Sequence, residues 1–88
     1  MRITSKDLEI LCKRINEITG NKLEPYTRDE NRNKANIGTY YIDMAYGGNK
    51  LVQISNDGGG VNEITYGYVS KRELYNSMQA YKSGLETN

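Results

Sequence analysis

Residues 37–69 read IGTYYIDMAYGGNKLVQISNDGGGVNEITYGYV, three runs rich in β-branched and aromatic residues that are separated by two glycine turns. Such runs are typical of strands, and paired glycines accept the positive φ angles that tight hairpins need. The pattern therefore predicts an antiparallel meander. Its three strands are expected at residues 37–45, 50–55 and 61–69, and its two turns at residues 46–49 and 56–60.

Helical patterns flank this region on both sides. In the first segment, apolar residues recur at the spacing of one helical face, at Leu8, Leu11, Cys12, Ile15 and Ile18. Thr4 or Ser5 is placed to cap this helix, and Gly20 to end it. In the last segment, Ser70 and Glu73 match a capping box ahead of a second apolar stripe. Cys12 lies on the first stripe with no His anywhere to activate it, so we interpret it as a small core residue.

Residues 21–36 are polar, contain Pro25 and show little periodicity, so we predict a long loop. It is interpreted as a solvated linker or as a contact segment with Tyr26, Arg28 and Arg32 as its contact residues. The expected order is α-β-β-β-α. We predict one small globular domain over residues 1–88, of α+β class, in which two helices cover one face of a three-stranded antiparallel meander.

Composition excludes several functions. The 88 residues carry 12 Lys or Arg against 11 Asp or Glu, which argues against a nucleic-acid partner. The chain lacks His and has a single Cys, so neither a catalytic triad nor a zinc site is expected. We predict a non-enzymatic protein without metal or cofactor. The absence of a long apolar run argues against a membrane partner and favours a cytoplasmic location.

The topology separates the two glycine turns, because one strand runs between them. At the triple-glycine turn, bare amides and the cations of the preceding loop suggest an anion site. The candidate ligand-binding residues there are Arg28, Arg32, Tyr41, Asn56, Asp57, Gly58, Gly59 and Gly60, with Lys34 and Asn36 within reach. A strained or flexible turn without a ligand is the alternative.

The other end of the sheet offers a second candidate, where a helix N-terminus lies beside the Gly47-Gly48 turn. Its residues are Tyr46, Gly47, Gly48, Ser70, Lys71 and Arg72. The alternative is that Ser70 is only a helix cap. All eight aromatic residues are Tyr, which serve either as a substitute for Phe in a thin core or as a binding face.

Several motifs together resemble a family of small phage-encoded proteins of unassigned function. They are NIGTYYID at residues 36–43, AYGG at 45–48, NDGGGV at 56–61 and GYVSKRELY at 67–75, and the likeness extends to the opening helix that ends in Thr19-Gly20-Asn21. The resemblance implies no residue roles. It implies a protein of the host cytoplasm that acts by binding, as small phage proteins without catalytic groups often do.

Two functions follow as hypotheses. In the first, a self-associating domain sequesters an anionic nucleotide-type small molecule as a counter-defence protein. In this hypothesis the ligand's polar edges would be bound by Asn56, Asp57 and the amides of Gly58–Gly60. Arg28 or Arg32 would pair with its phosphate, and Tyr41 would stack on it. In the second, the protein directly inhibits a host defence protein, in the manner of an anti-CRISPR. An accessory role in transcription or assembly is a third possibility, disfavoured by the net charge of +1.

Overall fold

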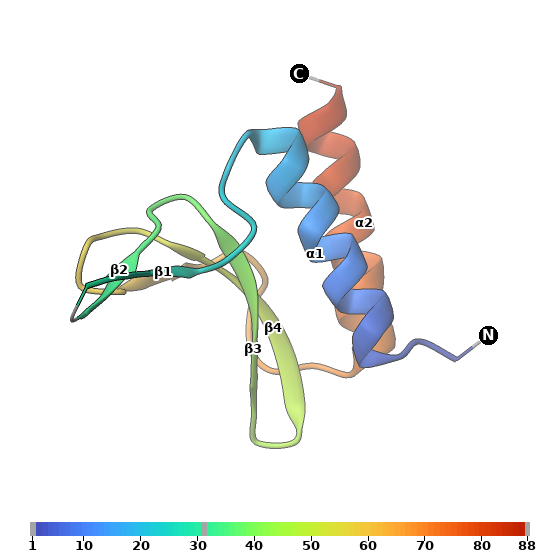
Figure 1. Ribbon diagram of the computed structural model, residues 1–88. Coiled ribbons are helices and arrows are strands. Elements are labelled where there is room, and N and C mark those ends of the chain that lie inside the picture. Colours follow the sequence, from blue (N-terminus) through green and yellow to red (C-terminus); the bar gives the residue numbers. More distant parts are fainter. Residues whose placement is uncertain (1, 31, 88) are drawn as a thin grey trace.

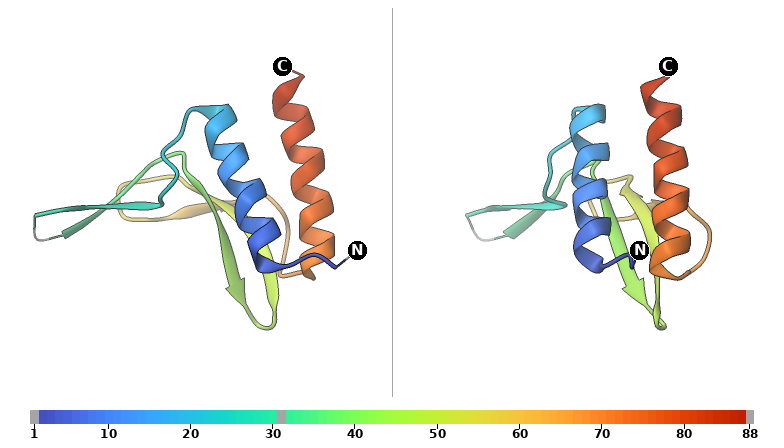
Figure 2. Two further views of the ribbon diagram at one scale, coloured as in Figure 1. Left: turned by 45° about the vertical axis from the view of Figure 1, so that its right-hand side comes forward. Right: turned by 90° about the vertical axis from the view of Figure 1, so that its right-hand side faces the viewer.

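The computed structural model describes residues 2–30 and 32–87 (Figure 1). Its elements are α1 (Ser5–Thr19), β1 (Tyr26–Asp29), β2 (Arg32–Ala35), β3 (Tyr40–Ala45), β4 (Gly48–Ile54), β5 (Val61–Glu63) and α2 (Lys71–Glu86). Strands β3, β4 and β5 form the predicted antiparallel meander, in that order. Helices α1 and α2 lie side by side on one face of it (Figure 2). The α+β class and the helix–meander–helix order are thus confirmed.

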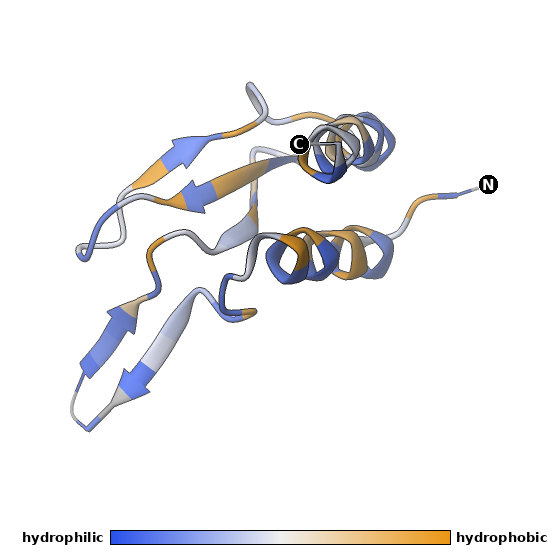
Figure 3. Ribbon diagram, turned by 90° about the horizontal axis from the view of Figure 1, so that it is seen from above, coloured by the Kyte–Doolittle hydropathy of each residue, from blue (hydrophilic) through white to orange (hydrophobic). Residues whose placement is uncertain are grey.

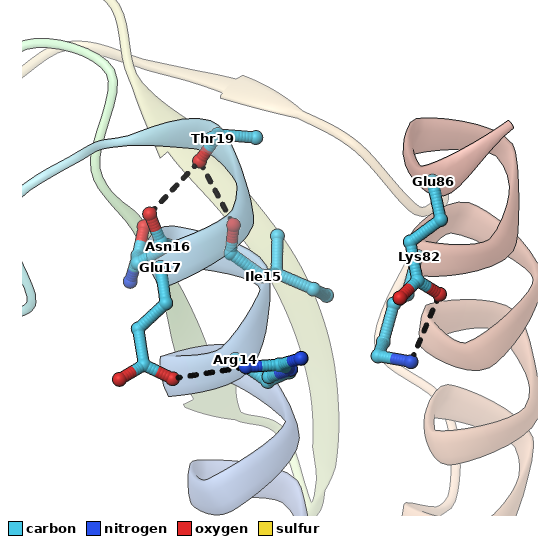
Figure 4. Close-up of polar contacts among 7 residues, drawn as sticks. All are labelled: Arg14, Ile15, Asn16, Glu17, Thr19, Lys82 and Glu86. Atoms are coloured by element: carbon cyan, nitrogen blue, oxygen red, sulfur yellow. Dashed lines mark hydrogen bonds and ion pairs between the residues drawn. The ribbon is translucent and has the colours of Figure 1, made fainter. Parts of the chain in front are cut away.

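Both helices begin where the sequence predicts, and α1 also ends there, whereas α2 continues through Gly84 to Glu86. Thr4 caps α1 through a capping box with Asp7, and Gly20 ends it in the left-handed region at φ +74°. In the last turn of α1, the Thr19 hydroxyl donates to the carbonyl of Ile15 at 2.8 Å (Figure 4). Ser70 Oγ accepts from the Glu73 amide at 3.2 Å and starts α2. Local capping therefore fixes both ends of α1 and the start of α2.

The main core lies between the two helices and the inner face of the sheet. Its buried members are Leu8, Leu11, Cys12, Ile15, Tyr40, Leu51, Leu74 and Met78. Tyr40 is 4% exposed, and its hydroxyl lies 2.6 Å from that of Tyr81. The two rings meet edge to face, with centroids 5.6 Å apart. At this position Tyr fills the core as Phe would, and its hydroxyl is satisfied by a second Tyr.

The prediction that residues 21–36 form a loop is wrong, because they contain a β-hairpin. Strands β1 and β2 pair antiparallel, from Tyr26 opposite Ala35 outward. The Asn36 side chain ties the base together by donating to the Glu24 carbonyl at 2.8 Å and to Thr27 Oγ at 2.9 Å. Most side chains of the hairpin are exposed, so its sequence lacks the alternation of apolar and polar residues that marks a strand.

Two strands are shorter than predicted. The first begins at Tyr40 rather than at residue 37, because Gly38 takes φ +98° in a turn. The third ends at Glu63, since the amides of Ile64 and Thr65 both turn to the Leu51 carbonyl. The chain returns to β4 only at a single bridge between Asn49 and Val69. Tyr66 is consequently 88% exposed, on the segment between β5 and α2.

Candidate functional site

The triple-glycine turn is organised around one side chain. Asn56 Oδ1 accepts from the amides of Gly58 and Gly60, both at 3.0 Å. The amide of Gly59 donates to the Asn56 carbonyl at 3.1 Å. All three glycine amides therefore already have partners inside the chain. The glycine amides are not free to bind an anion, contrary to the expectation for this turn.

Packing explains two of the three glycines. Gly59 adopts φ +86°, and a Cβ there would lie 2.8 Å from the Tyr26 hydroxyl. A Cβ on Gly60 would overlap the Asn56 side chain. Gly58 has no such restriction, since its nearest neighbour would be Asn56 Oδ1 at 3.4 Å. The turn is thus built to fold around Asn56 and beneath Tyr26.

The hairpin and this turn enclose a polar hollow. Figure 3 shows the β1–β2 and β4–β5 hairpins extending to the same side, away from the helices. Arg32, Asn33 and Lys34 of β2 and Asp57 of the turn line a hollow of about 470 Å³. The structure therefore brings together the predicted pair Arg32 and Asp57, adds Lys34, which was expected within reach, and adds Asn33, which was not expected.

Two other predicted residues lie elsewhere. Arg28, on β1, lies opposite Asn33 of β2 and is not among the residues that line the hollow. Tyr41 lines a different depression, between α1 and β3. Burial, with the nearby Tyr26 and Asp43, raises the pKa of the Tyr41 hydroxyl against the opposing effect of Lys50. Tyr26 is the aromatic ring that lies beside the triple-glycine turn.

The second predicted site is partly assembled. Gly47, Gly48 and Lys71 line one hollow of about 340 Å³, together with Met44, Ala45 and Asn49. Gly48 is required there, because a Cβ would lie 2.7 Å from Tyr68 Cβ. Tyr46 is 93% exposed, and its ring meets that of Tyr68 edge to face. Ser70 serves as the helix cap, and Arg72 is exposed at the start of α2.

The outer face of the sheet carries a charged cluster. The Lys50 ammonium lies 2.6 Å from Glu63 Oε1 and 4.5 Å from the centre of the Tyr68 ring. This contact raises the pKa of Lys50 and lowers that of Glu63. The Tyr68 hydroxyl donates to Asp43 at 2.7 Å, which raises the pKa of that hydroxyl. Each carboxylate thus has its own partner, and the two do not form an acid–base pair.

Other chemistry has little support among the described residues. Burial raises the pKa of the Cys12 thiol to about 12, which leaves it protonated and unreactive at neutral pH. Within residues 2–30 and 32–87, no group of three or more Cys, Asp or Glu gathers where a metal could bind. Neither helix, over the same residues, is long and apolar enough to cross a membrane.

Sequence reasoning missed an apolar groove between α1 and β3. It measures about 360 Å³ and is lined by Leu8, Cys12, Leu23, Pro25, Ile42 and Met44, among others. One signal was present in the sequence. Asn16 lies one turn after Cys12 on the apolar stripe of α1, and a polar residue at such a position indicates a buried hydrogen-bond partner. That partner is the backbone of Tyr40.

Comparison with models of protein families, with curated proteins and with solved structures found no match for this chain.

Proposed function

We propose that this protein is a non-catalytic binding protein that sequesters an anionic, nucleotide-type small molecule in the hollow between its β1–β2 and β4–β5 hairpins. The observation that carries this proposal is the gathering of Arg32, Lys34 and Asn33 opposite Asp57 around one hollow. Two adjacent cations suit a phosphate, since charge-assisted hydrogen bonds to phosphate are among the strongest in proteins. Asp57 supplies an acceptor for ribose hydroxyls or for a base N–H group.

The glycine turn has a supporting role in this proposal. Its amides are held by Asn56, so the turn fixes Asp57 in place rather than gripping the ligand. Tyr26, 41% exposed, packs beside Gly59 and braces the turn from β1. It does not itself line the hollow. The resemblance to small phage proteins suggests the biological setting, which is counter-defence by removal of a signalling nucleotide in the host cytoplasm.

Titration calorimetry against a panel of cyclic and ADP-ribose-type nucleotides tests the proposal. We expect at least one member to bind, and Arg32→Gln to weaken that binding by about tenfold or more. Arg28→Gln is the matched control, because it removes the same charge from the same hairpin at a position that does not line the hollow. No heat from any nucleotide, or equal losses in the two variants, would contradict a site in this hollow.

Self-association is part of this proposal. A core this small is often reinforced by a second subunit, which would also enlarge a shallow hollow into a pocket. Sedimentation velocity of the full chain measures the oligomeric state. A stable dimer or larger assembly is expected, and a strict monomer would favour the protein-inhibitor hypothesis.

Direct inhibition of a host defence protein is the second candidate. It is favoured by the exposure of two aromatic side chains, Tyr46 at 93% and Tyr66 at 88%, since exposed Tyr is enriched at protein interfaces. This candidate predicts a stable complex in pull-down experiments and no binding of small molecules. Tyr46→Ser with Tyr66→Ser would abolish the complex, while Arg32→Gln would leave it intact.

A further inference from the structure

Strand β3 has an open edge. It lies at one side of the three-stranded sheet and, within residues 2–30 and 32–87, pairs with β4 alone. In antiparallel sheets, residue pairs that exchange hydrogen bonds alternate with pairs that do not. Tyr40 belongs to the second kind, because its N–H and C=O bond to the Asn16 side chain and not to Gln53. Ile42 and Met44 share this parity, so their N–H and C=O groups point away from β4 as well.

An apolar groove runs beside this edge. Helix α1 covers β3 on the inner face (Figure 2), and Asn16 closes the edge at Tyr40. Beyond that point the groove opens, floored by Leu8, Cys12, Ile42 and Met44. Met44 is 61% exposed although it points to the helix side of the sheet. Unused backbone groups and an apolar floor thus lie along the same short segment.

We propose that this groove binds an extended peptide, which adds to β3 as a further strand. An extended peptide backbone carries donors and acceptors at the spacing that pairs with the N–H and C=O groups of both Ile42 and Met44. Peptide residues opposite Ile42 and Met44 would place apolar side chains in the groove. The residue between them would lie opposite Asp43, on the outer face of the sheet.

Charge selects the residue opposite Asp43. The Asp43 carboxylate accepts from the neutral Tyr68 hydroxyl. Its cross-strand neighbour Lys50 instead forms an ion pair with Glu63. The negative charge of Asp43 is therefore available to an added strand. Opposite charges on directly facing strand positions are stabilising, and like charges are destabilising. The peptide that fits has an apolar–basic–apolar pattern, with Lys or Arg in the middle.

The same charge disfavours a second copy of this chain as the occupant. The antiparallel β3–β3 register that uses all four free groups places Ile42 of each copy opposite Met44 of the other. That register sets the two Asp43 carboxylates directly opposite each other. The alternative register, with Ile42 opposite Ile42, aligns Met44 with Tyr40, whose backbone is already bonded to Asn16.

Selection from a displayed library of random seven-residue peptides on the full chain tests the proposal. We expect enriched peptides to carry Lys or Arg between two apolar residues. Met44→Pro should weaken the affinity of the best synthetic peptide by about tenfold or more. The substitution removes the outward N–H and leaves the hydrogen bonds between β3 and β4 in place. Asp43→Asn retains an acceptor for Tyr68 and should erase the preference for Lys over Gln. Arg32→Gln, in the separate polar hollow, should leave peptide affinity unchanged.

Amide exchange measured by NMR gives a second readout that does not depend on the folding of Met44→Pro. The selected peptide should slow exchange at Ile42 and Met44 in the unaltered protein. No enriched pattern, or an enriched peptide that protects neither amide, would overturn the proposal. Dimerisation that is abolished by Met44→Pro would assign the edge to a second copy and overturn it as well.

Discussion

Asn16 shows how one polar residue inside an apolar stripe organises a strand edge. It is 1% exposed, its Oδ1 accepts from the Tyr40 amide at 2.8 Å, and its Nδ2 donates to the Tyr40 carbonyl at 3.0 Å. The side-chain amide thus replaces one residue of a neighbouring strand. A buried backbone group without a hydrogen-bond partner destabilises the folded state. The two bonds from Asn16 are therefore needed for α1 to pack on β3.

Replacing this residue should therefore destabilise the fold. We expect Asn16→Ala to lower the free energy of unfolding by about 2 kcal/mol or more, because the Tyr40 amide loses its partner and the Tyr40 carbonyl keeps only the weak thiol donor of Cys12, at 3.4 Å. Lys13→Ala, at an exposed position on the same helix, is the control and should change it by less than about 0.5 kcal/mol. Urea denaturation followed by circular dichroism measures both. Equal effects in the two variants would show that water replaces the Asn16 side chain.

Cys12 predicts how stability depends on pH. Burial raises the pKa of its thiol from 9.0 to about 12 in the folded chain. Above pH 9 the unfolded chain loses this proton while the folded chain keeps it. The contribution of this thiol to stability is therefore fully present below pH 9, and it is lost as the pH rises from there towards 12. The slope for one proton is about 1.4 kcal/mol per pH unit.

Urea midpoints at half-unit steps from pH 8 to pH 11, with reductant present, measure this slope. Cys12→Ser removes the titrating group and should give a flat profile up to about pH 10, the ordinary pKa of Tyr. Above that value Tyr40, Tyr41 and Tyr68, whose pKa values are all raised in the folded chain, lower stability in both proteins. An identical decline between pH 9 and 10 in the two proteins would rule out Cys12 as its cause.

At the scale of elements, the geometry of the triple-glycine turn predicts that substitution by Ala has a different effect on stability at each of the three glycines. Gly58→Ala should be close to neutral, because its Cβ meets only an ordinary contact. Gly59→Ala should cost about 1 kcal/mol or more, since Ala is strained at φ +86° and would approach the Tyr26 hydroxyl. Gly60→Ala displaces the Asn56 side chain and should cost a similar amount. Thermal unfolding of the three variants compares them directly.

The same series separates the structural role of the turn from a role in ligand binding. If Gly58→Ala retains stability but lowers the affinity for the nucleotide that binds the hollow, the turn contacts the ligand. If the three variants lose affinity only in proportion to their stability, the turn acts as a support for Asp57 and Tyr26.

The elements differ in how far the sequence alone predicts them. Both helices were predicted with their caps, because caps and apolar stripes are local signals. The β1–β2 hairpin was not, since Arg32, Asn33 and Lys34 are all exposed and leave no alternation to detect. The early end of β5 was also missed. It depends on a tertiary contact, the capture of Ile64 and Thr65 by the Leu51 carbonyl.

The candidate site was predicted in outline only. The position of Arg32 near Asp57 followed from topology, because the chain enters β3 beside the triple-glycine turn. The position of Arg28 outside the hollow did not, since it depends on the pairing of β1 with β2. The sequence pattern also did not predict that Asn56 accepts hydrogen bonds from the amides of Gly58 and Gly60. Such an arrangement depends on the rotamer of one side chain.

At the scale of the whole molecule, the β1–β2 hairpin stands apart from the main core. None of the buried residues that join the helices to the sheet comes from it. It projects from the body of the protein (Figures 1 and 2) and is anchored at its base by Asn36 and by the buried Ala35. A two-stranded hairpin in water is marginally stable on its own. The hairpin should therefore open without unfolding the helices.

Hydrogen exchange measures this difference and connects it to the proposed function. We expect the amides that pair β1 with β2 to exchange by local opening, and the buried amides of β3, β4 and α1 to exchange only by global unfolding. Because Arg32 and Lys34 lie on the hairpin, a nucleotide held in the hollow should slow exchange in β1 and β2 and leave α2 unchanged. Protection by the nucleotide that was uniform over the whole chain would instead indicate binding to the main body of the fold.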